Sequence, residues 1–99
     1  MEKLVVTRYH ALFQYLKEIG LIDEDTKVLS HAKGSDVIGR HVLGVLPYWL
    51  SSLAEKYTEV QVRVPIEMKG KELTLEQMRF YSLKPKTYQV REVPFEDEV

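Results

Sequence analysis

The sequence comprises 99 residues, and none of them is cysteine, which excludes disulfides and thiolate chemistry. Residues 1–91 hold 14 basic and 11 acidic residues, a net charge of +3 that suits a small anionic ligand but is too weak to indicate long nucleic acid. We expect one domain over residues 1–99, ending in an acidic, frayed tail at 92–99. With no recognisable signal peptide or membrane-spanning stretch, the default location is the cytoplasm and no membrane partner is expected.

The first segment predicts a short strand at residues 4–7 and a helix that ends at Gly20. The apolar face of this helix comprises Leu12, Phe13, Leu16 and Ile19. Thr7 is a plausible cap, so Arg8, Tyr9 and His10 follow the carboxyl end of the strand, where open α/β sheets bind their ligands. The plain alternative is that Arg8 and His10 are simply solvated.

A second short strand is predicted at residues 27–31, followed by a loop at 32–35. His31 and Lys33 leave this strand in the direction of a glycine, which is a weak indication of a phosphate contact.

The central stretch changes abruptly from a buried strand at residues 42–46 to an amphipathic helix at 47–57. Leu46 is pushed out of helical geometry by the proline that follows, and Pro47 suits the first helical position. Gly44 allows close approach of another backbone or of a ligand. The free N–H groups at such a helix start form an anion site, although most strand–helix joints bind nothing.

Clean alternation predicts a further strand at residues 60–65, near a sheet edge. A polar loop follows at 69–73, and Thr74 with Gln77 forms a capping box for a short helix. A last strand is predicted around Tyr88 and Val90.

The resulting element order is β-α-β-β-α-β-α-β, which predicts a small Rossmann-like α/β domain with a mostly parallel sheet flanked by helices. The sequence has no dinucleotide or triphosphate loop and no nucleophile elbow, and its three histidines lack metal-ligand spacing. We therefore expect neither a cofactor nor a metal. The remaining candidates are cationic and hydrogen-bond-donor groups in loops after strands, together with the helix start at Pro47: Arg8, His10, His31, Lys33, Lys69 and Lys71. Such groups suit a phosphodiester, although scattered solvated lysines are an equally simple interpretation.

Three short motifs, at residues 5–8, 44–47 and 69–74, occur in the order and spacing of one family. Over residues 4–91 the chain resembles the small stand-alone CRISPR-associated proteins of the Csx-sixteen family, which accompany type III systems. The resemblance implies a minimal CARF-like fold and a homodimeric ring nuclease. Such an enzyme cuts cyclic tetra-adenylate to linear di-adenylate with a 2′,3′-cyclic phosphate, without a metal, and so switches off antiviral signalling.

The resemblance and the strand-end pattern together give a set of expected site residues. The expected catalytic groups are Arg8, His10 and Lys69, with Arg8 and Lys69 neutralising phosphorane charge and His10 carrying a proton. The other expected ligand contacts are Thr7, Tyr9, His31, Lys33, Gly44, Leu46, Pro47, Tyr48, Lys71 and Glu72.

Three positions depart from the family pattern: Tyr9 replaces a histidine, Lys69 an arginine, and Arg40 an acidic residue. The substitution at Tyr9 keeps open an alternative in which the chain binds or sequesters the cyclic messenger without cutting it. A purely structural partner of another CRISPR protein is a third interpretation, which leaves the strand-end cations without a role.

Overall fold

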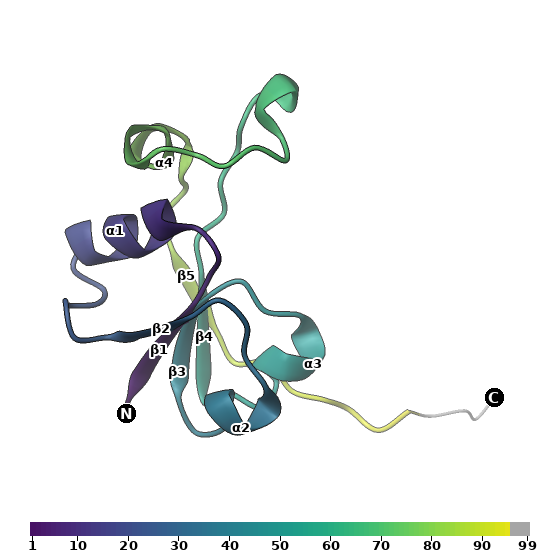
Figure 1. The fold of residues 1–99 in the computed structure, drawn as a ribbon. Helices are drawn as coiled ribbons and strands as arrows, with labels where there is room; N and C mark the ends of the chain where they lie inside the picture. The colour runs from purple at the N-terminus through teal and green to yellow at the C-terminus, as the bar shows by residue number, and fades with distance from the viewer. Residues whose placement is uncertain (96–99) are drawn as a thin grey trace.

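Five strands form one sheet in the order β2-β1-β3-β4-β5, in which only β5 is antiparallel to its neighbour. The computed structural model describes residues 1–95 (Figure 1). The strands are β1 (Lys3–Val6), β2 (Lys27–Leu29), β3 (His41–Gly44), β4 (Lys56–Glu59) and β5 (Lys86–Tyr88). The helices are α1 (His10–Glu18), α2 (Gly34–Val37), α3 (Tyr48–Ser51) and α4 (Leu75–Tyr81), with a 3₁₀ turn η1 (Ile66–Met68). The predicted mostly parallel α/β architecture is confirmed.

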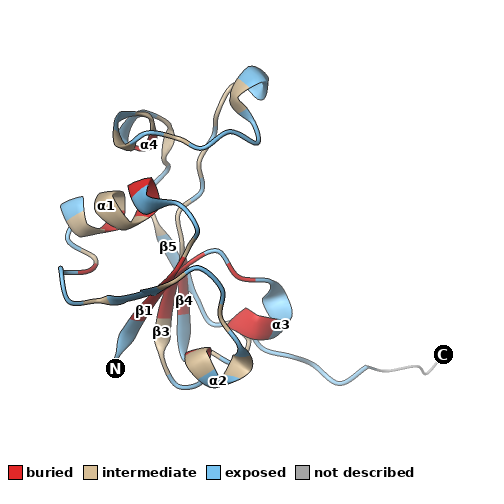
Figure 2. Ribbon diagram, in the orientation of Figure 1, coloured by how far each residue is buried: buried red, intermediate tan, exposed pale blue. Residues whose placement is uncertain are grey.

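Helices cover both faces of the sheet because its central strands are apolar on both sides. Leu4 and Val6 point toward α2 and α3, whereas Val5 points toward α1 and α4. Each face therefore has its own core, and Figure 2 shows the buried residues along the middle of the sheet and on the inner sides of α1 and α3. This arrangement places the ends of the central strands between two helical layers.

The predicted helix at 47–57 is wrong in length, because α3 ends at Ser51. The hydroxyls of Ser51 and Ser52 donate to the carbonyls of Tyr48 and Trp49 at 3.0 and 2.8 Å, a back-bonding that weakens helices. Residues 52–55 form turns, and β4 begins at Lys56. Tyr57, the last apolar residue of the predicted helix, is instead buried as a residue of strand β4.

The predicted strand at 60–65 is also wrong, since the strand of the main sheet lies earlier, at β4. Beyond β4 the chain makes only an isolated bridge, between Val62 and Ser82. The register of this bridge is shifted by one residue from that of the β4–β5 ladder, whose last pair is Glu59 with Lys86. Pro85, which has no N–H to donate, lies between Ser82 of the bridge and Lys86 of the ladder. The alternation did identify the inward side, because Val60 and Val62 pack against the core beneath α1.

Smaller differences concern element ends. The central strand stops at Gly44 rather than 46, the second strand covers 27–29 rather than 27–31, and part of the expected loop at 32–35 belongs to α2. The last strand is β5, which ends before Val90. Of the expected frayed tail, residues 96–99 lie outside the described residues. Among residues 1–95, no helix is long and apolar enough to cross a membrane.

Candidate ligand-binding site

The strand order reverses between β1 and β3, because β2 lies on one side of β1 whereas β3, the next strand in the chain, lies on the other side. In open α/β sheets, ligands bind beyond the carboxyl ends of strands at such a switch point. A pocket of about 460 Å³ occupies this position. We call it the Arg8 pocket; its lining residues are Val6, Thr7, Arg8, Tyr9, Ser30, His31, Ala32, Val45, Leu46, Pro47, Trp49 and Leu50.

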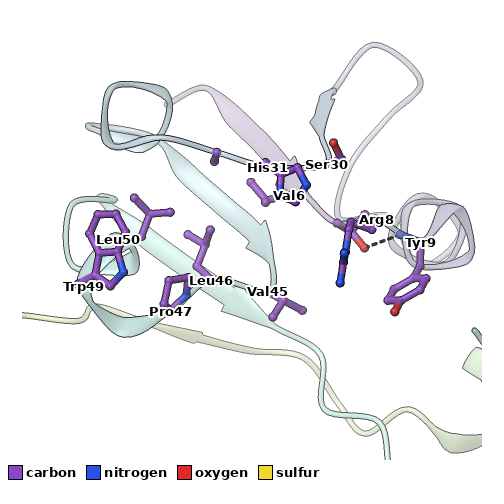
Figure 3. Close-up of a pocket in the computed structure, with 12 residues that line it drawn as sticks. Val6, Arg8, Tyr9, Ser30, His31, Val45, Leu46, Pro47, Trp49 and Leu50 are labelled. Carbon is purple, nitrogen blue, oxygen red and sulfur yellow. Dashed lines mark hydrogen bonds between the residues drawn. The ribbon is translucent and has the colours of Figure 1, made fainter. Parts of the chain in front are cut away.

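The polar and apolar parts of the Arg8 pocket come from different strand ends. Arg8, Tyr9 and His31 follow β1 and β2, whereas Pro47 and Trp49 follow β3 and lie on the opposite side of the pocket (Figure 3). A cationic side therefore faces an apolar, aromatic side. Such a pair of surfaces suits a ligand that carries both a phosphate and a flat ring.

Arg8 is exposed and makes no hydrogen bond or ion pair with any residue of the described chain. Two of the other arginines are bound within the fold: Arg40 bonds Glu2 at 3.0 Å, and Arg79 bonds Glu18 twice, at 2.8 and 2.6 Å. The Arg8 guanidinium thus retains its planar fork of donors for an anion.

Thr7 fixes the loop that carries Arg8. Its N–H donates to the carbonyl of Leu29 at 3.0 Å, and its Oγ1 accepts the N–H of Tyr9 at 3.0 Å. The expectation that Thr7 caps this helix is wrong: Tyr9 is the N-cap residue of α1, which has no side-chain cap bond, and the Thr7 hydroxyl instead closes a turn just before α1 begins at His10.

Gly44 serves a close backbone contact. It is buried with φ of +132°, and a Cβ built on it would lie 2.1 Å from the carbonyl oxygen of Val6. Only glycine lets β1 and β3 approach at this point, so the feature that suggested a ligand has a structural explanation.

The expected anion site at the start of α3 is weakened by the length of that helix. α3 has four residues, and its first bonds run from Leu50 and Ser51 to the carbonyl of Pro47 at 3.1 and 3.0 Å. Since a dipole of one turn is small, attraction for an anion rests mainly on the side chains of Arg8 and His31.

His10 lies outside the Arg8 pocket. It lines a neighbouring hollow of about 270 Å³ together with Arg8 and Phe13, and its ring stacks on Phe13 with centroids 6.1 Å apart. His31, which the sequence indicated only weakly, is the histidine that shares the Arg8 pocket.

The remaining expected contacts divide among other surfaces. Lys71 lines a mostly apolar hollow beside Tyr9, and Tyr48 lines two hollows on the far side of α3. Lys33, Lys69 and Glu72 are exposed, and none of them lines the Arg8 pocket or the other four hollows at the surface of residues 1–95 that the site residues border. Lys69 follows η1, on the green segment that projects away from the sheet at the top of Figure 1.

Sequence reasoning missed Ser30 and Trp49. Ser30 directly follows β2, as Arg8 follows β1 within two residues, so the same strand-end rule would have found it. Trp49 remains 67% exposed although it is the largest side chain at the pocket. The only tryptophan of the chain, placed two residues after Pro47, was the available signal.

The family model described as "Putative CRISPR-associated protein (Cas_VVA1548)" matches residues 4–91. The chain belongs to this CRISPR-associated family. No curated protein and no solved structure gives a significant match. The matched range includes every residue that lines the Arg8 pocket, so the pocket lies wholly within the part of the chain that defines the family.

Proposed function

We propose that this CRISPR-associated protein binds cyclic tetra-adenylate and cuts it to linear di-adenylate bearing a 2′,3′-cyclic phosphate, and that it thereby ends type III antiviral signalling. The observation that carries the proposal is the unpaired Arg8 at the switch-point pocket, beside His31 and opposite Trp49. A cyclic oligonucleotide offers phosphates to the side chains of Arg8 and His31 and bases to the aromatic side.

In the proposed reaction, the 2′-hydroxyl of one ribose attacks the adjacent phosphorus and loses its proton to a base. The bond from phosphorus to the 5′-oxygen of the next nucleotide breaks, and that oxygen takes up a proton. Two such cuts convert the ring into two di-adenylates. Arg8 neutralises the growing phosphorane charge, and His31, which lines the Arg8 pocket whereas His10 does not, moves a proton.

We further propose that the ligand is held by a two-fold pair of chains. A pocket of about 460 Å³ has room for one or two nucleotides but not for a ring of four. A two-fold pairing would present two copies of each strand-end loop to a ligand that is itself two-fold symmetric. Light scattering should therefore find a dimer, at least with cyclic tetra-adenylate present; a monomer under both conditions contradicts this part.

The alternative is a protein that sequesters the ring without cutting it. The position of His10 favours this alternative, because its ring stacks on Phe13 outside the Arg8 pocket and Tyr9 takes the place of the family's histidine. In that case the protein would bind the ring, but no linear product would form.

The test is incubation of the purified protein with labelled cyclic tetra-adenylate, with and without excess EDTA. Linear di-adenylate in both reactions supports a metal-independent ring nuclease, because the nucleophile belongs to the RNA and side chains meet the charge. Binding without product supports the sequestering alternative. Absence of both binding and cleavage contradicts the proposed function.

Variants locate the chemistry. Arg8→Ala should lower the cleavage rate at saturating ligand ~10²–10³-fold, as loss of a transition-state charge contact does, and Arg63→Ala, an exposed arginine outside the pockets, is the matched control. Loss of a proton carrier costs about 10²–10⁴-fold, so His31→Ala and His10→Ala compare the two histidines directly. Lys69→Ala should have a smaller effect, mainly on the ligand concentration required. An Arg8→Ala protein that cuts as fast as the parent would place the site elsewhere.

A further inference from the structure

A second hollow lies on the other side of the wall formed by Leu46 and Pro47. Its volume is about 500 Å³, within the usual range for small-molecule sites of ~300–1,000 Å³. We call it the tyrosine groove; it is lined by Leu46, Pro47, Tyr48, Tyr57, Glu59, Gln61 and Tyr88. Leu46 and Pro47 also line the Arg8 pocket, so the two hollows share this wall.

The groove follows from strand register and from the shortness of α3. Tyr57 pairs directly with Tyr88 across β4 and β5, and directly paired residues of antiparallel strands point to the same face. Glu59, two residues after Tyr57, shares that face. Because α3 ends after four residues, it leaves this outer part of the sheet open. Tyr48, at the start of α3, borders the opening and is 81% exposed.

The seven lining residues do not favour a phosphate in the groove, although Lys86, which pairs with Glu59 across β4 and β5, points to the same face of the sheet. None of the seven lining residues is cationic, and Glu59 contributes a negative charge. In the described residues the Glu59 carboxylate makes no hydrogen bond and no ion pair, so its oxygens remain available as acceptors. Exposed tyrosine rings beside a free carboxylate and the Gln61 amide favour a flat, uncharged ring that carries an N–H donor.

We propose that the tyrosine groove binds the adenine base of one nucleotide of the cyclic ligand. This proposal rests on the proposed function, because the phosphate of the same nucleotide occupies the neighbouring Arg8 pocket. The base stacks on Tyr88 and Tyr48, its exocyclic amino group donates to Glu59, and a ring nitrogen accepts from the Gln61 amide. The Arg8 pocket, on one side of the shared wall, offers a positive charge for the phosphate of a nucleotide. The tyrosine groove, on the other side, offers aromatic rings and a carboxylate for its base.

Adenosine and inosine test the groove without any phosphate. Inosine has a carbonyl oxygen in place of the amino group, and this oxygen would face the Glu59 carboxylate. In ¹⁵N spectra of the protein we expect adenosine to shift the amide signals of residues 57–61 and 86–88, and inosine to bind about tenfold more weakly. Glu59→Gln should remove this preference, whereas the control Glu55→Gln, an exposed carboxylate outside the groove, should keep it. Unshifted signals at both segments, or an unchanged preference in Glu59→Gln, overturn the proposal.

Binding of cyclic tetra-adenylate connects the groove with the proposed function. Loss of one stacking ring typically weakens binding about tenfold, so Tyr88→Ala should show this loss and Tyr88→Phe should recover it. Phe80→Ala removes a 79% exposed ring on α4, outside both hollows, and should leave affinity unchanged. Circular dichroism verifies that each variant is folded. Equal affinity of Tyr88→Ala and the parent overturns the subsite even if the ring is cut. If the parent does not bind the ring, the proposed function fails and the adenosine titration still decides the groove.

Discussion

Replacing Gly44 by alanine is the sharpest test of how the sheet sets the shape of the Arg8 pocket. The new Cβ would lie 2.1 Å from the carbonyl oxygen and 3.0 Å from the carbonyl carbon of Val6. Both atoms belong to the backbone of β1, so no side-chain rotation can relieve the overlap. β1 and β3 must separate at the point where Val45 donates its N–H to Val6 at 3.2 Å.

The expected cost of Gly44→Ala combines three effects. A non-glycine residue at φ of +132° carries strain of ~1–3 kcal/mol. Forcing extra volume into a packed interior costs a further ~1–3 kcal/mol, and the weakened hydrogen bond about 1 kcal/mol. We therefore expect a loss of about 3–7 kcal/mol in the free energy of unfolding, against a total of ~5–15 kcal/mol for a domain. For a domain of this size, even the smaller loss lowers the Tm by about 12 °C or more.

Urea unfolding followed by circular dichroism measures the effect, and Gly39→Ala is the matched control. Gly39 also has a positive φ, of +73°, but a Cβ there would meet nothing within 4 Å. The control should lose only the left-handed strain of about 1–2 kcal/mol. If Gly44→Ala loses no more free energy of unfolding than Gly39→Ala, the close approach of the two strands is not what requires glycine.

Three further predictions concern stability. Burial, and then the charges of two nearby lysines, lower the pKa of His41 in the folded protein, so its contribution to stability is complete above pH 6.5 and declines as the pH falls from 6.5 toward the folded-state pKa. His41→Gln should flatten the pH dependence of the free energy of unfolding in that window. Tyr57→Phe should cost about 1–3 kcal/mol, because the hydroxyl accepts the N–H of Leu46 and donates to the carbonyl of Gly44, and unfolding in urea will show it. Thr74→Ala should cost about 1 kcal/mol in the same assay, because it removes the side chain that caps α4.

The fold class was predictable because strands and helices alternate, but the structure of two segments, 47–57 and 60–65, was not. The stretch 47–57 has helical apolar spacing, yet only its first turn is helical, since Tyr57 gains more as a buried strand residue beside β3. Clean alternation at 60–65 likewise identified which side faces the core but not whether the segment pairs with the main sheet. Local periodicity reports burial; the pairing partner is chosen by tertiary contacts.

The candidate site was predictable where it depends on parallel strand ends. Arg8, His31 and Pro47 each follow a strand, and parallel neighbours bring such residues to one edge of the sheet. Lys69 also lies in a loop, but that loop follows η1 on the excursion between β4 and α4; the excursion meets the strand-end edge at Lys71, which lines a hollow with Thr7 and Tyr9, and not at Lys69. The tyrosine groove required the β4–β5 register, which the sequence pattern did not reveal.

The wall between the Arg8 pocket and the tyrosine groove is held by one buried hydroxyl. Beyond β3 the chain no longer pairs with β4, but the Tyr57 hydroxyl accepts the N–H of Leu46 at 2.9 Å and donates to the carbonyl of Gly44 at 3.1 Å. These bonds fasten the chain on both sides of Val45, whose own N–H is bound to β1. Hydrogen bonds from the Tyr57 side chain to the backbone, and not apolar packing alone, thus fix the separation of the two hollows. A nucleotide that spans the wall would meet surfaces already in position, and less of its binding free energy would be lost in ordering the protein.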